Sequence, residues 1–183
     1  MDHTFLSWPF FEGRHADLAT ELGQWAKSNI VNIDHHDIDN ACRELVSNLA
    51  TGNWLKYCAP QPNARGPKYF DVRSLCLIRE TLAYYSGLAD FSFAMQGLGS
   101  GPITLYGSQG IKNEYLPAVR EGKKIAAFAL SEPDAGSDVA AISTSATIED
   151  GAYTLNGEKT WISNGGIADY YVVFARTGDG SGA

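Results

Sequence analysis

The sequence is poor in cysteine. Its 183 residues include three cysteines, Cys42, Cys58 and Cys76, which lie far apart, are odd in number and form no Cys-x-x-Cys pair. Such usage argues against a disulfide framework and is typical of reduced thiols. We therefore expect a cytoplasmic protein.

Positive charge is also scarce. The chain has 14 Lys and Arg against 21 Asp and Glu, a formal net charge of −7, and its nearest approach to a basic cluster is the pair Lys123-Lys124. This balance argues against a nucleic-acid-binding surface. No apolar run approaches the length that spans a bilayer, and the N-terminus lacks the basic and apolar regions of a secretory signal. We expect neither nucleic acid nor a membrane as a partner.

Several common functional signatures are missing. There is no Gly-x-Ser-x-Gly and no Walker loop, and the glycine cluster Gly97 to Gly101 lacks the strand-before, helix-after context of a nucleotide-binding loop. Asp34-His35-His36-Asp37 is a candidate metal site, but adjacent histidines rarely point at one ion and no third, distant ligand stands out. We interpret this run as a solvated helix entry and predict no metal.

The periodicity of the chain changes near residue 122. With 44% hydrophobic and 19% charged residues, the chain is long enough for one large core or two small ones. Before residue 122 the apolar spacing is helical. Helices are expected over Asp17 to Ala26, from a cap at Asp37 or Asp39 to a stop at Gly52, and through Val72, Leu75, Ile78 and Leu82.

Two segments that contain glycine or proline interrupt this helical pattern. The four glycines and Pro102 between Gly97 and Gly107 indicate close packing or a break rather than a free-standing helix. Ser108 is expected to start a short helix. Pro117 suits the first turn of a second short helix better than the middle of one long helix.

After residue 122 the period becomes two, which indicates strands. Strand-like pieces are Ile125 to Leu130, the alternation of Ile142, Thr144, Ala146 and Ile148 with polar residues, and Tyr170 to Phe174. Tight-turn signals between them are Asp150-Gly151, Asn156-Gly157 and Gly165-Gly166. The prediction is an α+β fold, with an N-terminal helical bundle domain over 1–121 and an incomplete antiparallel β-domain over 122–183.

The last residues, Thr177 to Ala183, are typical of a loop between strands rather than of a finished terminus. Only about four strands precede them, and a sheet this small with open edges needs further chain or a partner. We therefore expect the sequence to be the N-terminal piece of a longer protein.

Two short segments carry the chemistry. Ser131 to Asp138 is almost all small or polar, so its backbone N–H groups and hydroxyls suit phosphate oxygens or a polar ring edge. If Glu158 to Ser163 is a strand, Trp161 and Ser163 share a face, roughly 6–7 Å apart along it, and can stack on a flat ligand and hydrogen-bond its edge. Plainer alternatives stay open, namely a polar loop between strands and a core tryptophan beside a turn serine.

The first of these segments also contains three acidic residues, Glu132, Asp134 and Asp138. A pair of carboxylates can act as a general acid and base. Three acidic residues in one loop are more often solvated or used as caps, and we favour that interpretation here.

The two segments resemble the signatures of the acyl-CoA dehydrogenase family. Ala129-Leu130-Ser131-Glu132-x-x-Ala135-Gly136-Ser137-Asp138 matches the first, and the match continues through Asn156-Gly157-Glu158-Lys159-Thr160-Trp161-Ile162-Ser163-Asn164. Tyr171 to Thr177 is similar to the next strand of the family, and Leu98 to Pro102 and Tyr106 to Ser108 are similar to its helix-to-helix region. The likeness spans residues 70 to 177.

The resemblance implies a fold of three parts, of which this chain covers the N-terminal helical domain and part of the middle β-domain. It implies FAD as the cofactor, held by Phe128, Leu130, Ser131, Gly136, Ser137, Trp161, Ile162 and Ser163. In the family, the position of Ser131 bonds the pyrimidine edge of the flavin, that of Trp161 packs on the ring, and that of Ser163 bonds its reactive nitrogen. The position of Ser137 lies near the cofactor pyrophosphate and the thioester arm of the substrate.

The activity that the resemblance implies is α,β-dehydrogenation of an acyl-CoA thioester in fatty acid metabolism. The base of the family is a glutamate of the C-terminal domain, so no residue of this chain inherits a catalytic role. The fragment alone is therefore expected to be inactive and to hold FAD weakly or not at all. The resemblance further implies an electron-transfer flavoprotein as acceptor and a homo-oligomer at full length.

Two other functions stay open. An acyl-CoA oxidase or a related flavin monooxygenase on the same fold would consume oxygen. A non-catalytic interaction module would keep the scaffold without the downstream glutamate.

Overall fold

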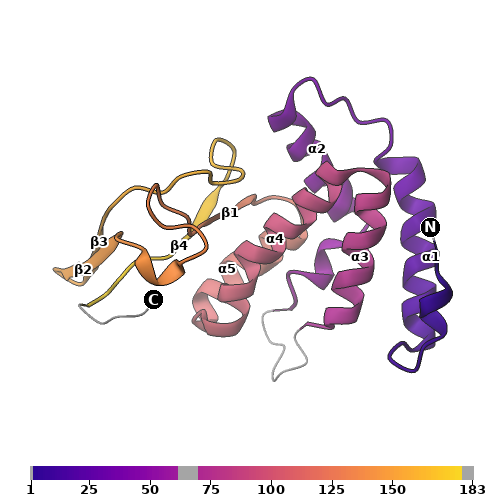
Figure 1. Ribbon diagram of the computed structural model, residues 1–183, viewed down its shortest axis with the longest axis horizontal. Helices are drawn as coiled ribbons and strands as arrows, with labels where there is room; N and C mark the ends of the chain where they lie inside the picture. Colours follow the sequence, from indigo (N-terminus) through magenta and orange to yellow (C-terminus); the bar gives the residue numbers. More distant parts are fainter. Residues whose placement is uncertain (1, 62–69, 179–183) are drawn as a thin grey trace.

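The computed structural model describes residues 2–61 and 70–178. Within these ranges a helical part precedes a strand-containing part, which confirms the predicted α+β class (Figure 1). The helices are η1 (Thr4–Ser7), α1 (Gly13–Asn29), α2 (Ile38–Thr51), η2 (Leu55–Tyr57), α3 (Val72–Tyr85), α4 (Gly87–Tyr106), α5 (Gln109–Arg120) and η3 (Val139–Ala141). The strands are β1 (Ala126–Ala129), β2 (Ser145–Glu149), β3 (Ala152–Asn156) and β4 (Tyr170–Val173).

Helices α1, α2 and α3 form where the apolar spacing predicts them. The buried face of α1 includes Leu18, Leu22 and Ala26, at intervals of four residues. Helix α2 begins after Asp37, whose carboxylate accepts a hydrogen bond from the N–H of Asn40 at 3.0 Å, and it ends at Gly52. Local caps and periodicity are therefore sufficient to define these elements.

Asp71 joins the N-terminal ends of α1 and α3. Its carboxylate lies 2.9 Å from the Nε2 of the buried His15 and accepts a hydrogen bond from the Ser74 hydroxyl at 3.0 Å. The guanidinium groups of Arg14 and Arg73 also reach it. Burial opposes ionisation, but these donors outweigh it and hold the pKa of Asp71 well below its usual range.

Helices α4 and α5 both run through a proline. Pro102 lies inside α4, so of the two alternatives for Gly97 to Gly107, close packing or a break, the break does not occur. Pro117 lies inside α5, so the separate helix expected there was wrong. Each proline removes a single N–H donor, and tertiary packing of the helix outweighs that loss. The start of α5 was predicted correctly, since the Ser108 hydroxyl accepts a hydrogen bond from the Ile111 N–H at 3.3 Å.

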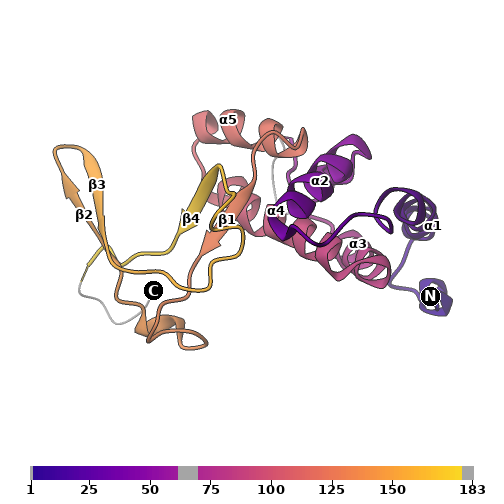
Figure 2. The same cartoon turned by 90° about the horizontal axis from the view of Figure 1, so that it is seen from above.

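Among the described residues the strands form two two-stranded sheets, and one of them is parallel. Strand β1 pairs with β4 in parallel, with Ala126 opposite Tyr170 and Ala129 opposite Val173. The antiparallel arrangement predicted for the whole domain is therefore wrong for this pair. The connection between the two strands contains η3 and the β2–β3 hairpin, and it is long enough to return the chain to the same end of the sheet. In Figure 2 β1 and β4 lie side by side, and the hairpin projects away from the helices.

Strands β2 and β3 form an antiparallel hairpin, as predicted, with Glu149 opposite Ala152. Asp150 and Gly151 have φ values of 51° and 79°, both in the left-handed region that a type I′ turn requires. The β2 strand begins only at Ser145, although the alternation starts at Ile142. The turn predicted at Asn156-Gly157 ends β3 but leads into no further strand until β4.

Helix α4 fixes β1 to the helical part. The fully buried side chain of Gln96 accepts a hydrogen bond from the Ala126 N–H at 2.8 Å and donates one to the Lys124 carbonyl at 2.9 Å. One turn later a Cβ on Gly99 would lie 2.3 Å from the Cβ of Ala126, so α4 and β1 touch at this glycine. The close packing that the glycine cluster indicates is therefore present.

Candidate functional site

The two chemistry-bearing segments meet at the carboxyl end of β1. The Thr160 N–H donates a hydrogen bond to the Ser131 carbonyl at 3.0 Å. One residue away on each segment, the Lys159 ammonium donates to the Leu130 carbonyl at 2.9 Å. These contacts bring the Ser131 loop and the Trp161 segment together.

The Ser131 loop begins with a tight turn. Glu132 and Ala135 exchange main-chain hydrogen bonds of 2.9 and 3.2 Å around Pro133 and Asp134. Further along, the carboxylate of Asp138 accepts a hydrogen bond from the Ala140 N–H at 3.2 Å and caps η3. Of the three acidic residues, Asp138 is thus a cap, as favoured from the sequence, and Asp134 is exposed at the corner of the turn.

Glu132 is a buried structural acceptor, which differs from the solvated or capping role expected of it. Its carboxylate accepts hydrogen bonds from the N–H groups of Ser143 and Thr144, at 2.5 and 2.9 Å, and from the Ser143 hydroxyl at 2.8 Å. The Lys159 ammonium lies 2.8 Å from it. Burial opposes ionisation, but the bonds from Lys159 and Thr144 hold the pKa of Glu132 well below its usual range. A carboxylate held in this way is unsuited to act as a base at neutral pH.

The segment from Glu158 to Ser163 is not a strand, which corrects the geometric argument made from the sequence. Trp161 has a φ of 56° and Asn164 a φ of 62°, both in the left-handed region that bulky residues rarely adopt. No strand is present between β3 and β4, and the left-handed φ of Trp161 interrupts any alternation, so alternation cannot align Trp161 with Ser163. The path of this segment is determined instead by hydrogen bonds to the carbonyls of Ala126, Leu130 and Ser131, in β1 and directly after it.

Trp161 is exposed, which rules out the plainer alternative of a core tryptophan. It keeps 91% of its surface accessible in a backbone conformation that costs about 1–3 kcal/mol for an ordinary residue. Such strain persists only where the surroundings impose it. A large, exposed indole is suited to stacking on a flat ligand.

The residues predicted to hold a cofactor differ in exposure. Phe128, Leu130, Ser131, Ile162 and Ser163 are partly buried, and Gly136, Ser137 and Trp161 are exposed. Phe128 packs on Phe174, with ring centroids 4.9 Å apart. A Cβ on Gly136 would meet no atom within 4 Å. All eight residues therefore have surface that a ligand can reach.

The polar groups at the site consist mainly of donors. The carbonyls of Leu130 and Ser131 are bonded to Lys159 and Thr160, whereas the N–H groups of Leu130 and Ser131 have no partner among residues 2–61 and 70–178. Within the same ranges the hydroxyls of Ser131, Ser137 and Ser163 make no hydrogen bond. Free donors beside an exposed indole fit the acceptor-rich edge of a flavin and phosphate oxygens.

Sequence reasoning missed two residues that build this site, Lys159 and Asn164. Asn164 donates from Nδ2 to the Ala126 carbonyl at 3.0 Å and so ties the end of the Trp161 segment to the start of β1. A lone lysine and a lone asparagine in a polar stretch give no signal of such long-range contacts. Both residues lie in the stretch Asn156 to Asn164 that resembles the family, but the resemblance assigned them no role.

An apolar cavity of about 370 Å³ lies between α3 and α4 and was also not predicted. Its wall includes Phe70, Leu75, Phe93, Met95 and Leu98, with Arg79 as the charged residue. The guanidinium of Arg79 is held by the carboxylate of Asp90 at 2.8 and 2.9 Å. The cavity therefore suits an apolar ligand.

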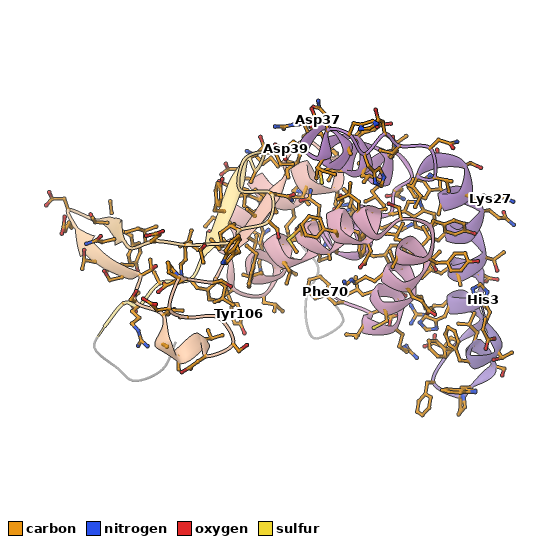
Figure 3. All side chains as sticks on the ribbon, turned by 45° about the horizontal axis from the view of Figure 1, so that its top comes forward. His3, Lys27, Asp37, Asp39, Phe70 and Tyr106 are labelled. Atoms are coloured by element: carbon orange, nitrogen blue, oxygen red, sulfur yellow. The ribbon has the colours of Figure 1, made fainter. Side chains whose placement is uncertain are left out.

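Residues 34–37 form a solvated helix entry, as interpreted from the sequence. All four are exposed, and the carboxylate of Asp34 accepts a hydrogen bond from the His36 N–H at 3.0 Å. Figure 3 shows Asp37 and Asp39 at the outer end of α2. In the part of the chain that the structure describes, no group of His, Cys, Asp and Glu is arranged to hold a metal ion.

In the same described part, none of the helices has the length and apolar character needed to cross a membrane.

Known proteins share both parts of this architecture. The acyl-CoA dehydrogenase N-terminal domain matches residues 13–123, and the acyl-CoA dehydrogenase middle domain matches residues 127–183. A curated relative, the short-chain specific acyl-CoA dehydrogenase of Megasphaera elsdenii, is 40% identical over 152 residues, which cover 81% of this chain and 39% of the relative.

Solved structures agree with these matches. Butyryl-CoA dehydrogenase from Megasphaera elsdenii has a TM-score of 0.73 and 30% identity, covering 100% of this chain and 47% of that one. An acyl-CoA dehydrogenase from Bacillus anthracis, complexed with FAD, has a TM-score of 0.76 and 31% identity, covering 91% of this chain and 30% of that one. The chain thus spans less than half the length of these relatives. On the strength of the two domain matches and the shared fold, the chain belongs to the acyl-CoA dehydrogenase family.

Proposed function

We propose that the chain forms the flavin-holding part of an FAD-dependent dehydrogenase that acts on acyl-CoA thioesters. The observation that carries this proposal is the meeting of the Ser131 loop with the segment of the exposed, strained Trp161. Family membership and the FAD complex of the Bacillus anthracis relative support it.

Each residue has a proposed task. FAD supplies the hydride-accepting chemistry when it is bound. Trp161 stacks on the ring, with Phe128 and Ile162 as apolar neighbours. The N–H groups of Leu130 and Ser131 and the hydroxyls of Ser131 and Ser163 donate to the ring edge, where they stabilise negative charge. Gly136 and Ser137 contact the pyrophosphate, and Ser137 also contacts the substrate.

The substrate and partners follow from the family and are proposals as well. We assign the substrate as an acyl-CoA, and the apolar cavity between α3 and α4 is a candidate for its acyl chain. The resemblance to the family implies a base in the C-terminal domain, and we do not propose Glu132 for this role because its carboxylate is fully engaged by its donors. We also propose an electron-transfer flavoprotein as acceptor, a homo-oligomer, and a domain boundary between 121 and 122. The free thiols of Cys42, Cys58 and Cys76 support the cytoplasm as the compartment.

The test is flavin binding by the complete gene product. The purified protein is expected to carry FAD, and Trp161→Ala is expected to weaken FAD binding while leaving the free energy of unfolding within about 0.5 kcal/mol, since the indole is exposed. Trp8→Ala is the matched control, because Trp8 is also exposed but directly follows η1 near the N-terminus, outside the two segments of the site. Wild-type protein that binds no FAD would refute the proposal.

The position of the base can be tested with the 183-residue chain alone. Mixed with FAD and an acyl-CoA, this chain is expected to leave the flavin absorbance unchanged, since the proposed base lies in the C-terminal domain of the family and Glu132 is unsuited to remove the α-proton. Bleaching of the flavin by the isolated chain would contradict the assignment of the base to another part of the protein.

A further inference from the structure

Lys159 and Glu132 form a buried ion pair directly behind the proposed flavin-holding residues. The side chains are 11% and 3% exposed, and the ammonium lies 2.8 Å from the carboxylate. Two buried charges are stable only when their remaining donors and acceptors are also satisfied. The carboxylate meets this condition, because Ser143 and Thr144 donate to it as well.

The pair connects three stretches of chain that are distant in sequence. Through Glu132 it holds residues 143–144, and through the Leu130 carbonyl, 2.9 Å from Nζ, it holds the exit of β1. Lys159 itself stands two residues before Trp161. Asn164 holds the other side of Trp161 through its bond to the Ala126 carbonyl. The strained Trp161 therefore lies between two side chains that are bonded to the start of β1 and to the residue directly after it.

The contact with the Leu130 carbonyl also determines which polar groups face a ligand. Lys159 and Thr160 occupy the carbonyls of Leu130 and Ser131, and the N–H groups of the same two residues stay without a partner in the described ranges. Without the ammonium, the Leu130 carbonyl would lose its donor and the Glu132 charge would be uncompensated. Both changes add negative potential beside the ring edge, where the reduced flavin carries its own negative charge.

We propose that Lys159, through its pair with Glu132, is a positioning residue for the flavin, which sets the spacing between the Ser131 loop and Trp161 and keeps the site rich in donors. This inference rests on the proposed function, since it assumes that FAD binds at these two segments. It assigns no contact between Lys159 and the cofactor.

The experiment uses the complete gene product, stripped of FAD and titrated with it, and compares four variants with the wild type. Lys159→Met removes the ammonium, and Lys159→Arg keeps the charge. Lys159→Met combined with Glu132→Gln removes both charges, so that no uncompensated carboxylate stays buried. Lys123→Met is the matched control, because it breaks the exposed pair between Lys123 and Glu121.

For Lys159→Met we expect the Kd for FAD to rise about tenfold or more, and the midpoint potential of the bound flavin to fall. Lys159→Arg is expected to keep a Kd and a midpoint potential close to those of the wild type. Lys123→Met is expected to match the wild type in both quantities. The double variant is expected to bind FAD weakly, because the Leu130 carbonyl still lacks its donor, but with a smaller change in potential than Lys159→Met. Circular dichroism gives the folded fraction by which each Kd is corrected.

The outcomes separate this inference from the function on which it rests. Wild-type protein that binds no FAD overturns both. The positioning role alone is overturned if the wild type binds FAD and Lys159→Met changes neither the corrected Kd nor the midpoint potential. If Lys159→Met does not fold, the double variant decides, and wild-type FAD affinity in that variant overturns the role.

Discussion

Gly99 provides a sharp test of how the helical part meets the strands. A Cβ at this position would lie 2.3 Å from the Cβ of Ala126 and 3.0 Å from the hydroxyl oxygen of Tyr170. Ordinary carbon–carbon contact begins near 3.5 Å, so Gly99→Ala requires α4 and β1 to separate by about 1 Å. The Ala126 methyl cannot rotate away, because it is attached directly to the backbone. The strand itself must move, and with it the 2.8 Å bond between Gln96 and the Ala126 N–H.

Two opposing effects decide the sign of the change. Replacing glycine by alanine inside a helix contributes about 1 kcal/mol of stability through propensity. Overpacking of a tight contact costs about 1–3 kcal/mol, and the rigid neighbour brings Gly99→Ala to the upper part of that range. We therefore expect a net loss of about 1–2 kcal/mol in the free energy of unfolding.

The matched control is Gly87→Ala in the same helix, where a Cβ would meet no atom within 4 Å. That variant is expected to gain about 0.4–1 kcal/mol, because it lowers the entropy of the unfolded chain without a clash. Urea unfolding followed by circular dichroism measures both variants. Equal stability of Gly99→Ala and Gly87→Ala would refute the contact between α4 and β1.

Two further predictions concern the helix ends. Asp71→Asn is expected to lower the free energy of unfolding at pH 7 by about 1–2 kcal/mol, because charged hydrogen bonds to His15 and Ser74 are lost. The folded-state pKa of Asp71 is lowered, so its stabilisation is present above the unfolded value of about 3.9 and is lost as the pH falls further. Denaturant unfolding should thus show a difference between wild type and variant that shrinks below pH 4, and a constant difference would contradict the ion-pair account. Ser108→Ala is expected to cost about 1 kcal/mol through loss of the α5 cap, while the exposed Ser28→Ala stays within about 0.5 kcal/mol in the same assay; equal losses would count against the cap.

The elements that the sequence predicted correctly are those whose causes are local. Helix α2 has its cap at Asp37 and its stop at Gly52 within the element, and the β2–β3 turn is specified by Asp150-Gly151. Pro102 and Pro117 indicated helix breaks or boundaries because a proline destabilises the interior of a helix. Tertiary packing of α4 and α5 outweighs this cost. The packing of α4 includes the close approach of Gly99 to Ala126, a long-range contact that no local sequence pattern predicts.

The parallel pairing of β1 with β4 was missed for a similar reason. The alternation of apolar residues predicts a strand, but it does not indicate whether the neighbouring strand runs parallel or antiparallel to it. Here the long connection permits the parallel direction, and contacts between the two strands fix it. One is the bond from the Asp169 N–H to the Ile125 carbonyl at 2.8 Å, which joins the starts of the two strands.

The two chemistry-bearing segments meet in the fold, but not through the geometry argued from the sequence. The sequence analysis placed Trp161 and Ser163 on one face of a strand over Glu158 to Ser163, and that strand does not form. The actual restraints on the strand side are carbonyl oxygens, those of Ala126, Leu130 and Ser131. Every residue type has a carbonyl, so side-chain patterns cannot record which of them will be bonded. Two of these carbonyls are reached by side chains, that of Leu130 by Lys159 and that of Ala126 by Asn164, so these two residue types carry information about the contacts. Trp161 adopts a left-handed backbone conformation that its residue type disfavours. Contacts with residues distant in sequence therefore have to stabilise this conformation, because the local sequence does not.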